Sequence, residues 1–325
     1  MPPLILAVGE VADGTLTRLS TEVATLARSL AEAAGGSAVG LVVDAAPDAA
    51  AAELAMYLPR VVAVASPDTA GEVWAPRAVA EVRRLVDEGV SHVVLGATAD
   101  GRDAAGALVG LTGWGLLANA DGAGWDGEGP VTVSSVLGGK AIVRSTLTAP
   151  AGIVTVRPGA VAAEPAAGAG AVESRQPAAE PATPAVPVLD RVSEAGAEAS
   201  LEEARIVVVG GRGVGSPDGF GIVEDLAGLL GGVVGATRAS VDAGWIAYAR
   251  QIGQTGKVVK PALYLGLGVS GAMQHRVGMQ SAGTIVAVNR DPDAPIAEVA
   301  DLFVVGDLFE VGPALAAELR ARRGA

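Results

Sequence analysis

Short apolar runs alternate with segments of helical hydrophobic periodicity through the first part of the chain. Strands are predicted over residues 4–9, 38–43, 60–65 and 90–96. Helices are predicted over residues 17–34, 48–57, 75–88 and 102–117. Each strand is followed by a single helix, which is the pattern of βαβ units in a parallel, doubly wound sheet.

The pattern changes to short β-type runs after residue 130. Residues 131–137, 140–146 and 152–156 are rich in Val, Thr and Ser, with Gly138-Gly139 forming a hairpin signal over 137–140. These runs predict an antiparallel edge on the first sheet.

An Ala- and Pro-rich stretch follows and shows little hydrophobic periodicity. Such a segment buries too little apolar surface to offset the entropy of ordering it. We therefore predict an N-terminal α/β domain over residues 1–163, a connector over 164–200 and a C-terminal domain over 201–325. Residues 186–192 are a candidate strand that returns to the first domain.

The strand-and-helix pattern restarts in the C-terminal domain. Strands are predicted over residues 205–209, 233–236, 263–267, 284–288 and 302–305, and helices over 219–230 and 311–322. Polar or glycine-rich clusters follow the carboxyl ends of these strands, where open parallel sheets bind nucleotides. The fold class is therefore α/β, with a mostly parallel sheet in each of two domains.

Composition and charge exclude several kinds of partner and site. The chain has 325 residues, 45 of them Gly, and is 50% hydrophobic but only 3% aromatic, as suits Val-rich strands and Ala-rich helices. A net charge of −13 disfavours nucleic acid as a partner. The absence of Cys excludes disulfides and thiolate sites, and two His cannot form a three-histidine metal site. No metal site is predicted.

The chain carries no secretory signal at its N-terminus and no apolar run long enough to cross a bilayer. We therefore expect a cytoplasmic protein without direct membrane insertion.

The glycine cluster Gly210–Gly215 does not have the spacing of a dinucleotide fingerprint. Counting G-x-G-x-x-G from Gly211 reaches Ser216, and counting from Gly213 reaches Asp218. No phosphate-binding G-x-x-x-x-G-K-[ST] loop occurs either. One interpretation of these glycines is a tight strand-to-helix turn; the other is contact with an anion, which Arg212 within them favours.

Three further clusters have both a structural and a functional interpretation. Residues 270–275 predict the start of a helix with exposed N–H groups, and His275 is either a satisfied structural residue or a ligand-facing one. Thr237-Arg238 is either a surface ion pair or a polar group and a cation at a strand end. Residues 251–257 predict a loop whose backbone can approach a ligand closely.

These segments together resemble the α subunit of electron transfer flavoproteins. The resemblance is carried by the runs Gln251-Ile-Gly-Gln-Thr-Gly-Lys257, Leu263-Tyr-Leu-Gly-Leu-Gly-Val-Ser-Gly-Ala-Met-Gln-His275 and Thr284-Ile-Val-Ala-Val-Asn-Arg-Asp-Pro-Asp-Ala-Pro295. Residues 210–213, 235–244 and 307–308 fit the same order. Two departures are Thr237, where the family often has Ser, and residues 247–250, where it often has Pro and Asn.

The resemblance implies a noncovalent FAD on the C-terminal domain, with Arg212 near the cofactor and Thr237 and Arg238 beside its phosphates and flavin. It places Ile252, Gly253, Gln254 and Thr255 along the isoalloxazine, with the Thr255 hydroxyl near N5. It assigns the pyrophosphate to Ser270, Gly271, Ala272, Met273 and Gln274, the flavin C2 carbonyl to His275, and the adenosine to Asn289, Asp307 and Leu308. Arg238 and His275 are our candidates for stabilising negative charge on the reduced flavin.

The resemblance also implies an electron carrier rather than an enzyme with its own substrate. Such a protein is a heterodimer with an electron transfer flavoprotein β subunit, which usually holds AMP. It accepts electrons from acyl-CoA dehydrogenases of fatty acid β-oxidation, or from related flavoenzymes, and passes them to a membrane quinone oxidoreductase.

Three alternatives remain open at this point. The chain could be the α subunit of a bifurcating or pathway-dedicated flavoprotein. Outside the family, it could be an NAD-dependent enzyme with His275 as the base, or a nucleotide-binding module without a redox role.

Overall fold

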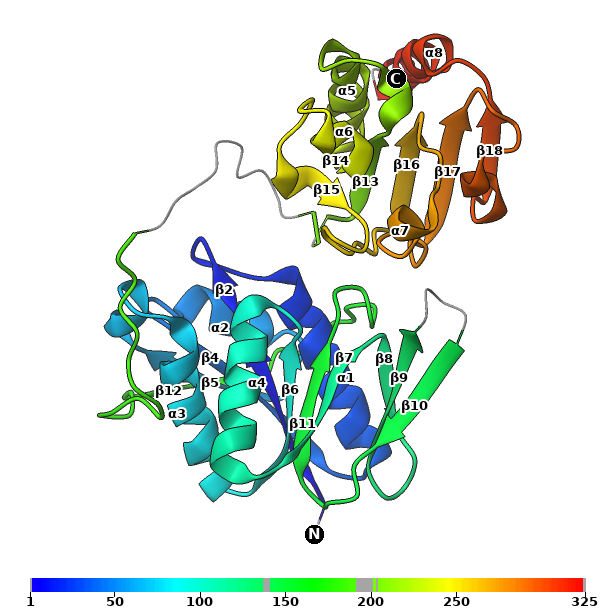
Figure 1. Ribbon diagram of the computed structural model, residues 1–325. Helices are drawn as coiled ribbons and strands as arrows, with labels where there is room; N and C mark the ends of the chain where they lie inside the picture. The colour runs from blue at the N-terminus through cyan, green and yellow to red at the C-terminus, as the bar shows by residue number, and fades with distance from the viewer. Residues whose placement is uncertain (1, 137–140, 191–200, 203, 324–325) are drawn as a thin grey trace. The chain divides into compact units, whose positions relative to one another are not determined.

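The computed structural model describes residues 2–136, 141–190, 201–202 and 204–323. The chain divides into two compact units, Met1–Val192 and Ser193–Ala325, and each has its own parallel sheet (Figure 1). The predicted α/β class with two mostly parallel sheets is confirmed. No helix in the described ranges is both long enough and apolar enough to span a membrane.

The first unit is built on a seven-stranded sheet in the order β12-β5-β4-β1-β6-β11-β7. Its strands are β1 (Leu4–Gly9), β4 (Ser37–Asp44), β5 (Arg60–Ala65), β6 (Val90–Gly96), β7 (Gly115–Ala120), β11 (Gly152–Val156) and β12 (Ala171–Arg175). Every neighbouring pair is parallel. A two-stranded ribbon, β2 (Val11–Ala12) and β3 (Thr15–Leu16), follows β1.

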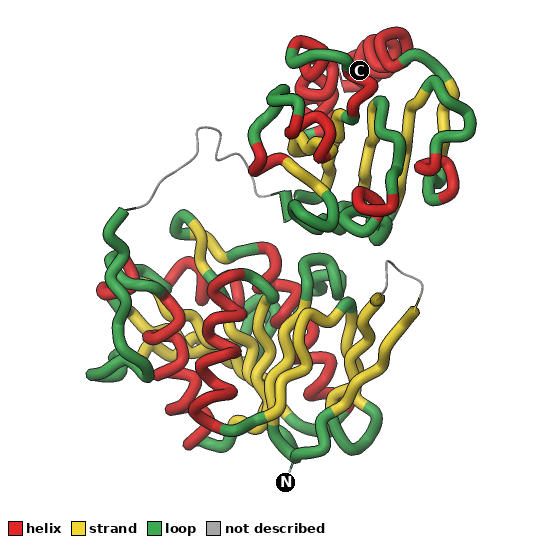
Figure 2. Tube along the Cα trace, in the orientation of Figure 1, coloured by secondary structure: helices red, strands yellow, loops and turns green. Residues whose placement is uncertain are grey.

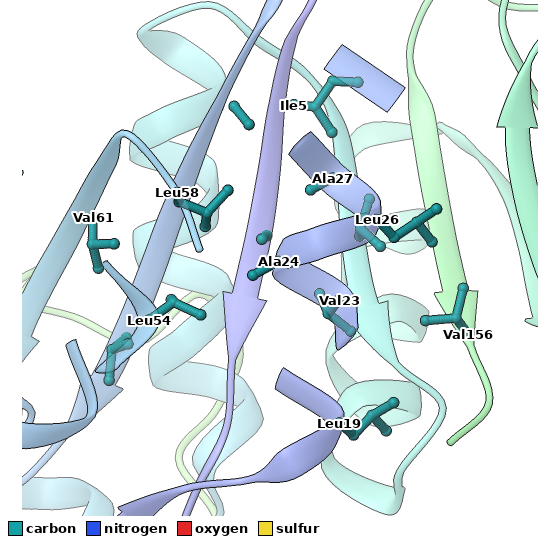
Figure 3. Close-up of a cluster of buried hydrophobic side chains, with 14 of the residues drawn as sticks. Ile5, Leu19, Val23, Ala24, Leu26, Ala27, Leu54, Leu58, Val61 and Val156 are labelled. Atoms are coloured by element: carbon teal, nitrogen blue, oxygen red, sulfur yellow. The ribbon is translucent and has the colours of Figure 1, made fainter. Parts of the chain in front are cut away.

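Helices cover both faces of this sheet. The helices α1 (Arg18–Ala33) and α2 (Asp48–Leu54) pack on one face, and α3 (Trp74–Asp87) and α4 (Ala99–Thr112) pack on the other. Side chains of a strand alternate between its faces, so Ile5 of β1 joins the core under α1 while Leu6 joins the core under α3 and α4. Figure 3 shows Leu19, Val23 and Leu26 of α1 among the side chains of the first core.

The predicted antiparallel edge is only partly correct. Strands β8 (Gly122–Trp125), β9 (Pro130–Val136) and β10 (Ala141–Thr146) form a separate antiparallel sheet. Residues 152–156 instead form β11, which is parallel and lies between β6 and β7. All five residues are buried, as is typical of an interior parallel strand. The hairpin expected at residues 137–140 lies outside the described residues.

The predicted fourth helix is also shorter than expected. It ends at Thr112, because Gly113 adopts a left-handed conformation with φ of 68° and closes the helix. The residues that follow form the edge strand β7.

The predicted connector over residues 164–200 contains a strand that was not expected, at residues 171–175. These residues form β12 and pair with β5, where Glu173 accepts hydrogen bonds from Arg60 and Arg175. Further along, the Val73 N–H donates to the Val186 carbonyl at 2.8 Å. Backbone pairing at a sheet edge, rather than apolar burial, holds this segment. Residues 191–200 lie outside the described part of the chain.

The second unit is built on a six-stranded sheet in the order β15-β14-β13-β16-β17-β18, with every pair parallel. Its strands are β13 (Ile206–Gly210), β14 (Val233–Thr237), β15 (Gln251–Ile252), β16 (Leu263–Leu267), β17 (Thr284–Asn289) and β18 (Leu302–Val305). Its α-helices are α5 (Gly221–Leu230), α6 (Arg238–Asp242), α7 (Met273–Arg276) and α8 (Leu308–Arg323). Figure 2 shows these helices and the long loops between them.

The order of these strands decides where a ligand can bind. The chain starts in the middle of the sheet at β13, moves outward through β14 to β15, and returns to β16 on the other side of β13. The loops after β13 and β16 therefore leave the sheet in opposite directions. The crevice that they leave at the carboxyl edge is where doubly wound sheets bind nucleotides. Helices α5 and α8 pack on one face of the sheet, on the core that includes Val208 and Leu265.

Candidate functional site

Two glycine-rich loops meet above the reversal point between β13 and β16. The Gly213 N–H donates to the Gly268 carbonyl at 3.0 Å, and a Cβ on Gly211 would lie 2.2 Å from the same oxygen. Only glycine permits this approach, because any side chain at position 211 would strike the Gly268 backbone. Arg212 lies in the 3₁₀ turn η2 (Arg212–Val214) between these glycines and is exposed. The loop thus combines a tight turn with an exposed cation.

The loop after β16 presents consecutive donors. In the described part of the chain, the backbone N–H groups of Ser270, Gly271 and Ala272 have no protein acceptor, and Ser270 itself is exposed. Gly271 has a φ of 76°, and a Cβ there would lie 2.4 Å from the Ile296 nitrogen. The helix expected over 270–275 begins only at Met273, so these donors belong to a loop before α7. Free N–H groups in such a loop suit an anion.

A short hydrogen-bond chain ends β14. The Ser240 hydroxyl donates to the Gly210 carbonyl at 3.3 Å, which leaves the Thr237 hydroxyl to donate to Ser240 at 3.2 Å. Thr237 is buried, and its hydroxyl proton is donated to Ser240 within the unit. Arg238 is different, since its side chain is 66% exposed and pairs only at the surface with Asp242. Arg238 is therefore an exposed cation that a ligand at this edge could contact.

The loop after β15 is closed by its own backbone and by two side chains. The Lys257 N–H donates to the Gln251 carbonyl at 2.8 Å, and the Gln254 N–H donates to the Gln274 carbonyl at 2.8 Å. The buried Gln251 amide donates to the Thr255 hydroxyl at 3.1 Å. The Tyr248 hydroxyl donates to the Thr255 carbonyl at 2.6 Å. Thr255 is exposed at the carboxyl edge, and both its hydroxyl and its carbonyl accept a hydrogen bond.

His275 is a buried structural residue in this arrangement. Its Nδ1 lies 3.0 Å from the Ile252 carbonyl, so this nitrogen carries the proton, and its Nε2 accepts from the Tyr264 hydroxyl at 2.8 Å. Burial lowers the pKa of His275 to about 4, although the hydrogen bond to the Ile252 carbonyl opposes the shift. The ring is therefore neutral at pH 7. The hypothesis that His275 supplies positive charge does not fit this geometry, and the same role for Arg238 stays a prediction.

The residues expected around an adenosine occupy the ends of β17 and β18. The Asn289 amide donates to the Val269 carbonyl at 2.8 Å and so supports the donor loop. Asp307 accepts from the Phe309 N–H at 2.9 Å and pairs with Arg290, and these two contacts lower its pKa in that order of importance. Leu308 is buried in the core under α8 and offers a ligand little side-chain surface.

The predicted residues thus share one edge of the sheet but differ in exposure, with Asn289 and Asp307 half-buried. Those with exposed side chains or backbone are Arg212, Arg238, Gln254, Thr255, Ser270, Ala272, Met273 and Gln274. Those buried beneath them are Thr237, Ile252, Gly253, Gly271, His275 and Leu308. The edge can hold an elongated ligand with an anionic centre, because donors and cations from several loops converge on it.

Two known family models match this chain. Residues 5–181 match the electron transfer flavoprotein domain, and residues 200–280 match the electron transfer flavoprotein FAD-binding domain. The electron transfer flavoprotein subunit alpha of Mycobacterium leprae is 43% identical over 327 residues, covering 98% of this chain and 99% of the relative. That of Bacillus subtilis is 35% identical over 320 residues, covering 97% of each.

The chain belongs to the electron transfer flavoprotein alpha subunit family. A third relative, the electron transfer flavoprotein subunit alpha of Thermoanaerobacterium thermosaccharolyticum, is 57% identical over 133 residues, or 41% of this chain. The match to the FAD-binding domain of the family includes the glycine loop, residues 251–257 and the donor loop at 270–272.

Three residues that support the site in this flavoprotein subunit were not among the predicted ones. They are Ser240, Gln251 and Tyr264, and all are buried. Gln251 stands next to the predicted Ile252, but its sequence position does not reveal that its amide contacts Thr255. Tyr264 is the one polar side chain in the apolar strand β16, which is a signal for a buried hydrogen-bond partner.

Proposed function

We propose that this chain is the FAD-carrying subunit of a heterodimeric electron transfer flavoprotein. The observation that supports it best is the carboxyl edge of the second sheet, where the reversal between β13 and β16 brings the free N–H groups of residues 270–272 close to the exposed loop of Arg212. These groups fit the pyrophosphate of a dinucleotide. The match to an FAD-binding domain favours FAD over other dinucleotides.

Most of the predicted site residues have a place in this proposal. Residues 270–272 and Arg212 hold the pyrophosphate, Asn289 and Asp307 bind the adenosine end, and residues 252–255 line the isoalloxazine. When bound, FAD supplies the one- and two-electron chemistry. Arg238 adds positive charge near the flavin, and the neutral His275 holds the Ile252 carbonyl from below.

We further propose that the electrons come from acyl-CoA dehydrogenases or related flavoenzymes and leave to a membrane quinone oxidoreductase. The names of the relatives, which are alpha subunits, support a β subunit as the partner, and we expect AMP on that subunit. The protein then acts in the cytoplasm as an electron carrier without substrate turnover of its own.

Co-expression with a neighbouring β-type chain tests this function. We expect a stable heterodimer with one FAD per complex, measured by cofactor release and chromatography, and reduction of that FAD by an acyl-CoA dehydrogenase with its substrate. Two FAD per heterodimer would favour a bifurcating system instead. A complex that binds NAD and no flavin would contradict the proposal.

A further inference from the structure

Gln251 is buried directly beneath the exposed Thr255, and its position is fixed by packing. Gln251 as a whole is 3% exposed. A Cβ on Gly256 would lie 2.9 Å from the Gln251 Cγ and 2.4 Å from its carbonyl oxygen, so the glycine lets the loop close tightly over Gln251. The Lys257 N–H also holds that carbonyl at 2.8 Å. The Cγ and the backbone carbonyl of Gln251 are therefore held beneath the loop, and its amide nitrogen is directed at the Thr255 hydroxyl.

That direction determines which way the Thr255 hydroxyl can donate. The Gln251 Nε2 donates to the Thr255 Oγ at 3.1 Å, and it is the only partner of this hydroxyl among the described residues. A hydroxyl that accepts from an N–H cannot point its own proton toward that N–H. The proton is thereby left for an acceptor on the exposed side.

The other threonine at this edge shows the contrast. Thr237 donates its proton to Ser240, inside the unit, and has nothing left to donate to a ligand. Thr255 has the reverse arrangement, because its buried neighbour is a donor rather than an acceptor. The backbone of Thr255 is held independently, through the Tyr248 hydroxyl on its carbonyl at 2.6 Å.

We infer that Gln251 is a positioning residue that makes the Thr255 hydroxyl a hydrogen-bond donor to the flavin. The inference rests on the proposed function, which places residues 252–255 along the isoalloxazine. Reduction adds electron density to an acceptor on that ring, and a donor stabilises the charged form more than the neutral one. Gln251 thereby raises the reduction potential of the cofactor without touching it.

The test measures the flavin midpoint potential and the FAD dissociation constant of the heterodimer for Gln251→Met, Thr255→Val and the double variant. Methionine keeps the length of glutamine but has no donor. We expect Gln251→Met to weaken binding of reduced relative to oxidised flavin by about threefold to tenfold, where tenfold equals about 59 mV for a one-electron couple. In the Thr255→Val background the same change should have no further effect on the potential.

Tyr248→Phe is the matched control for a loosened loop. It removes the contact to the Thr255 carbonyl but leaves the amide that orients the hydroxyl. We expect it to weaken FAD binding without the change in potential. Equal effects of Gln251→Met and Tyr248→Phe on the potential would overturn the inference, as would additive effects of Gln251→Met and Thr255→Val.

Gln251→Glu covers the case in which the methionine variant fails to bind FAD. It is isosteric, and at a pH at which the introduced carboxyl is ionised it can only accept, so it turns the Thr255 proton inward and should lower the potential measured there. A potential equal to that of the wild type contradicts the inference. If neither variant at position 251 binds FAD while Thr255→Val does, Gln251 is needed for the structure of the loop and not for the orientation of the Thr255 hydroxyl. The inference fails in that case too. A wild-type heterodimer without FAD would refute the proposed function itself, and the inference with it.

Discussion

The buried His275 makes the stability of the second unit depend on pH. His275 is 6% exposed, and burial lowers its pKa from 6.5 to about 4. In the unfolded chain the pKa returns to about 6.5. Between these two values the unfolded state binds a proton that the folded state does not bind. The stability contribution is therefore fully present above pH 6.5 and is lost as the pH falls toward about 4.

The size of the effect follows from the gap between the two pKa values. That gap corresponds to about 3 kcal/mol in the free energy of unfolding, and about 2 kcal/mol of it is lost by about pH 5. The variant His275→Gln removes the titration. Glutamine can still donate to the Ile252 carbonyl and accept from the Tyr264 hydroxyl, so it retains both contacts of the neutral ring.

Pulse proteolysis in urea measures this, because fragments of the two units can be followed separately. We expect the second unit of the wild type to lose about 2 kcal/mol between about pH 7.5 and about pH 5, and His275→Gln to lose clearly less. His92→Gln is the control, since burial also lowers the pKa of His92 but this residue belongs to the first unit. An equally steep loss in wild type and His275→Gln would refute the reasoning.

Three other substitutions test the site and its support. Arg238→Ala should lower the flavin midpoint potential by between about 40 and about 170 mV, whereas Arg320→Ala, which removes an exposed arginine on α8, should leave potentiometric titrations unchanged. Gly271→Ala should lower the free energy of unfolding by at least about 2 kcal/mol, because its methyl group would strike the neighbouring backbone, while Gly221→Ala, with open space around it, should stabilise slightly in urea titrations. Glu81→Ala removes a buried carboxylate that accepts the Ala178 N–H at 2.6 Å. It should destabilise the first unit by about 1–3 kcal/mol and speed cleavage after β12; unchanged cleavage would argue against this anchor.

The alternation of apolar runs and helical segments determined most of the fold. Val-rich runs such as residues 207–209 are buried on both faces, and this pattern is typical of interior parallel strands. Glycine and polar clusters after the strands also located the candidate edge. These signals are local, since each depends on a few neighbouring residues and on the period of the chain.

The tertiary structure decided what depends on partners distant in sequence. Residues 152–156 could have formed an edge, and only the pairing with β6 and β7 places them inside the sheet. Residues 171–175 have almost no buried side chains, so no hydrophobic pattern predicts a strand there. Strand β12 forms because its backbone pairs with that of β5.

The same limit applies to the site. Sequence position marked His275 and Thr255 as candidates but could not show which way either group points. The fold turns the His275 ring inward to Tyr264 and Ile252, and it leaves the Thr255 hydroxyl at the surface over Gln251. The direction of a hydrogen bond depends on both partners, and here Tyr264 and Ile252 come from strands at different positions in the sheet. The sequence therefore indicated which edge of the sheet carries the candidate site. The packing of the chain determined the hydrogen-bond partners of His275 and Thr255.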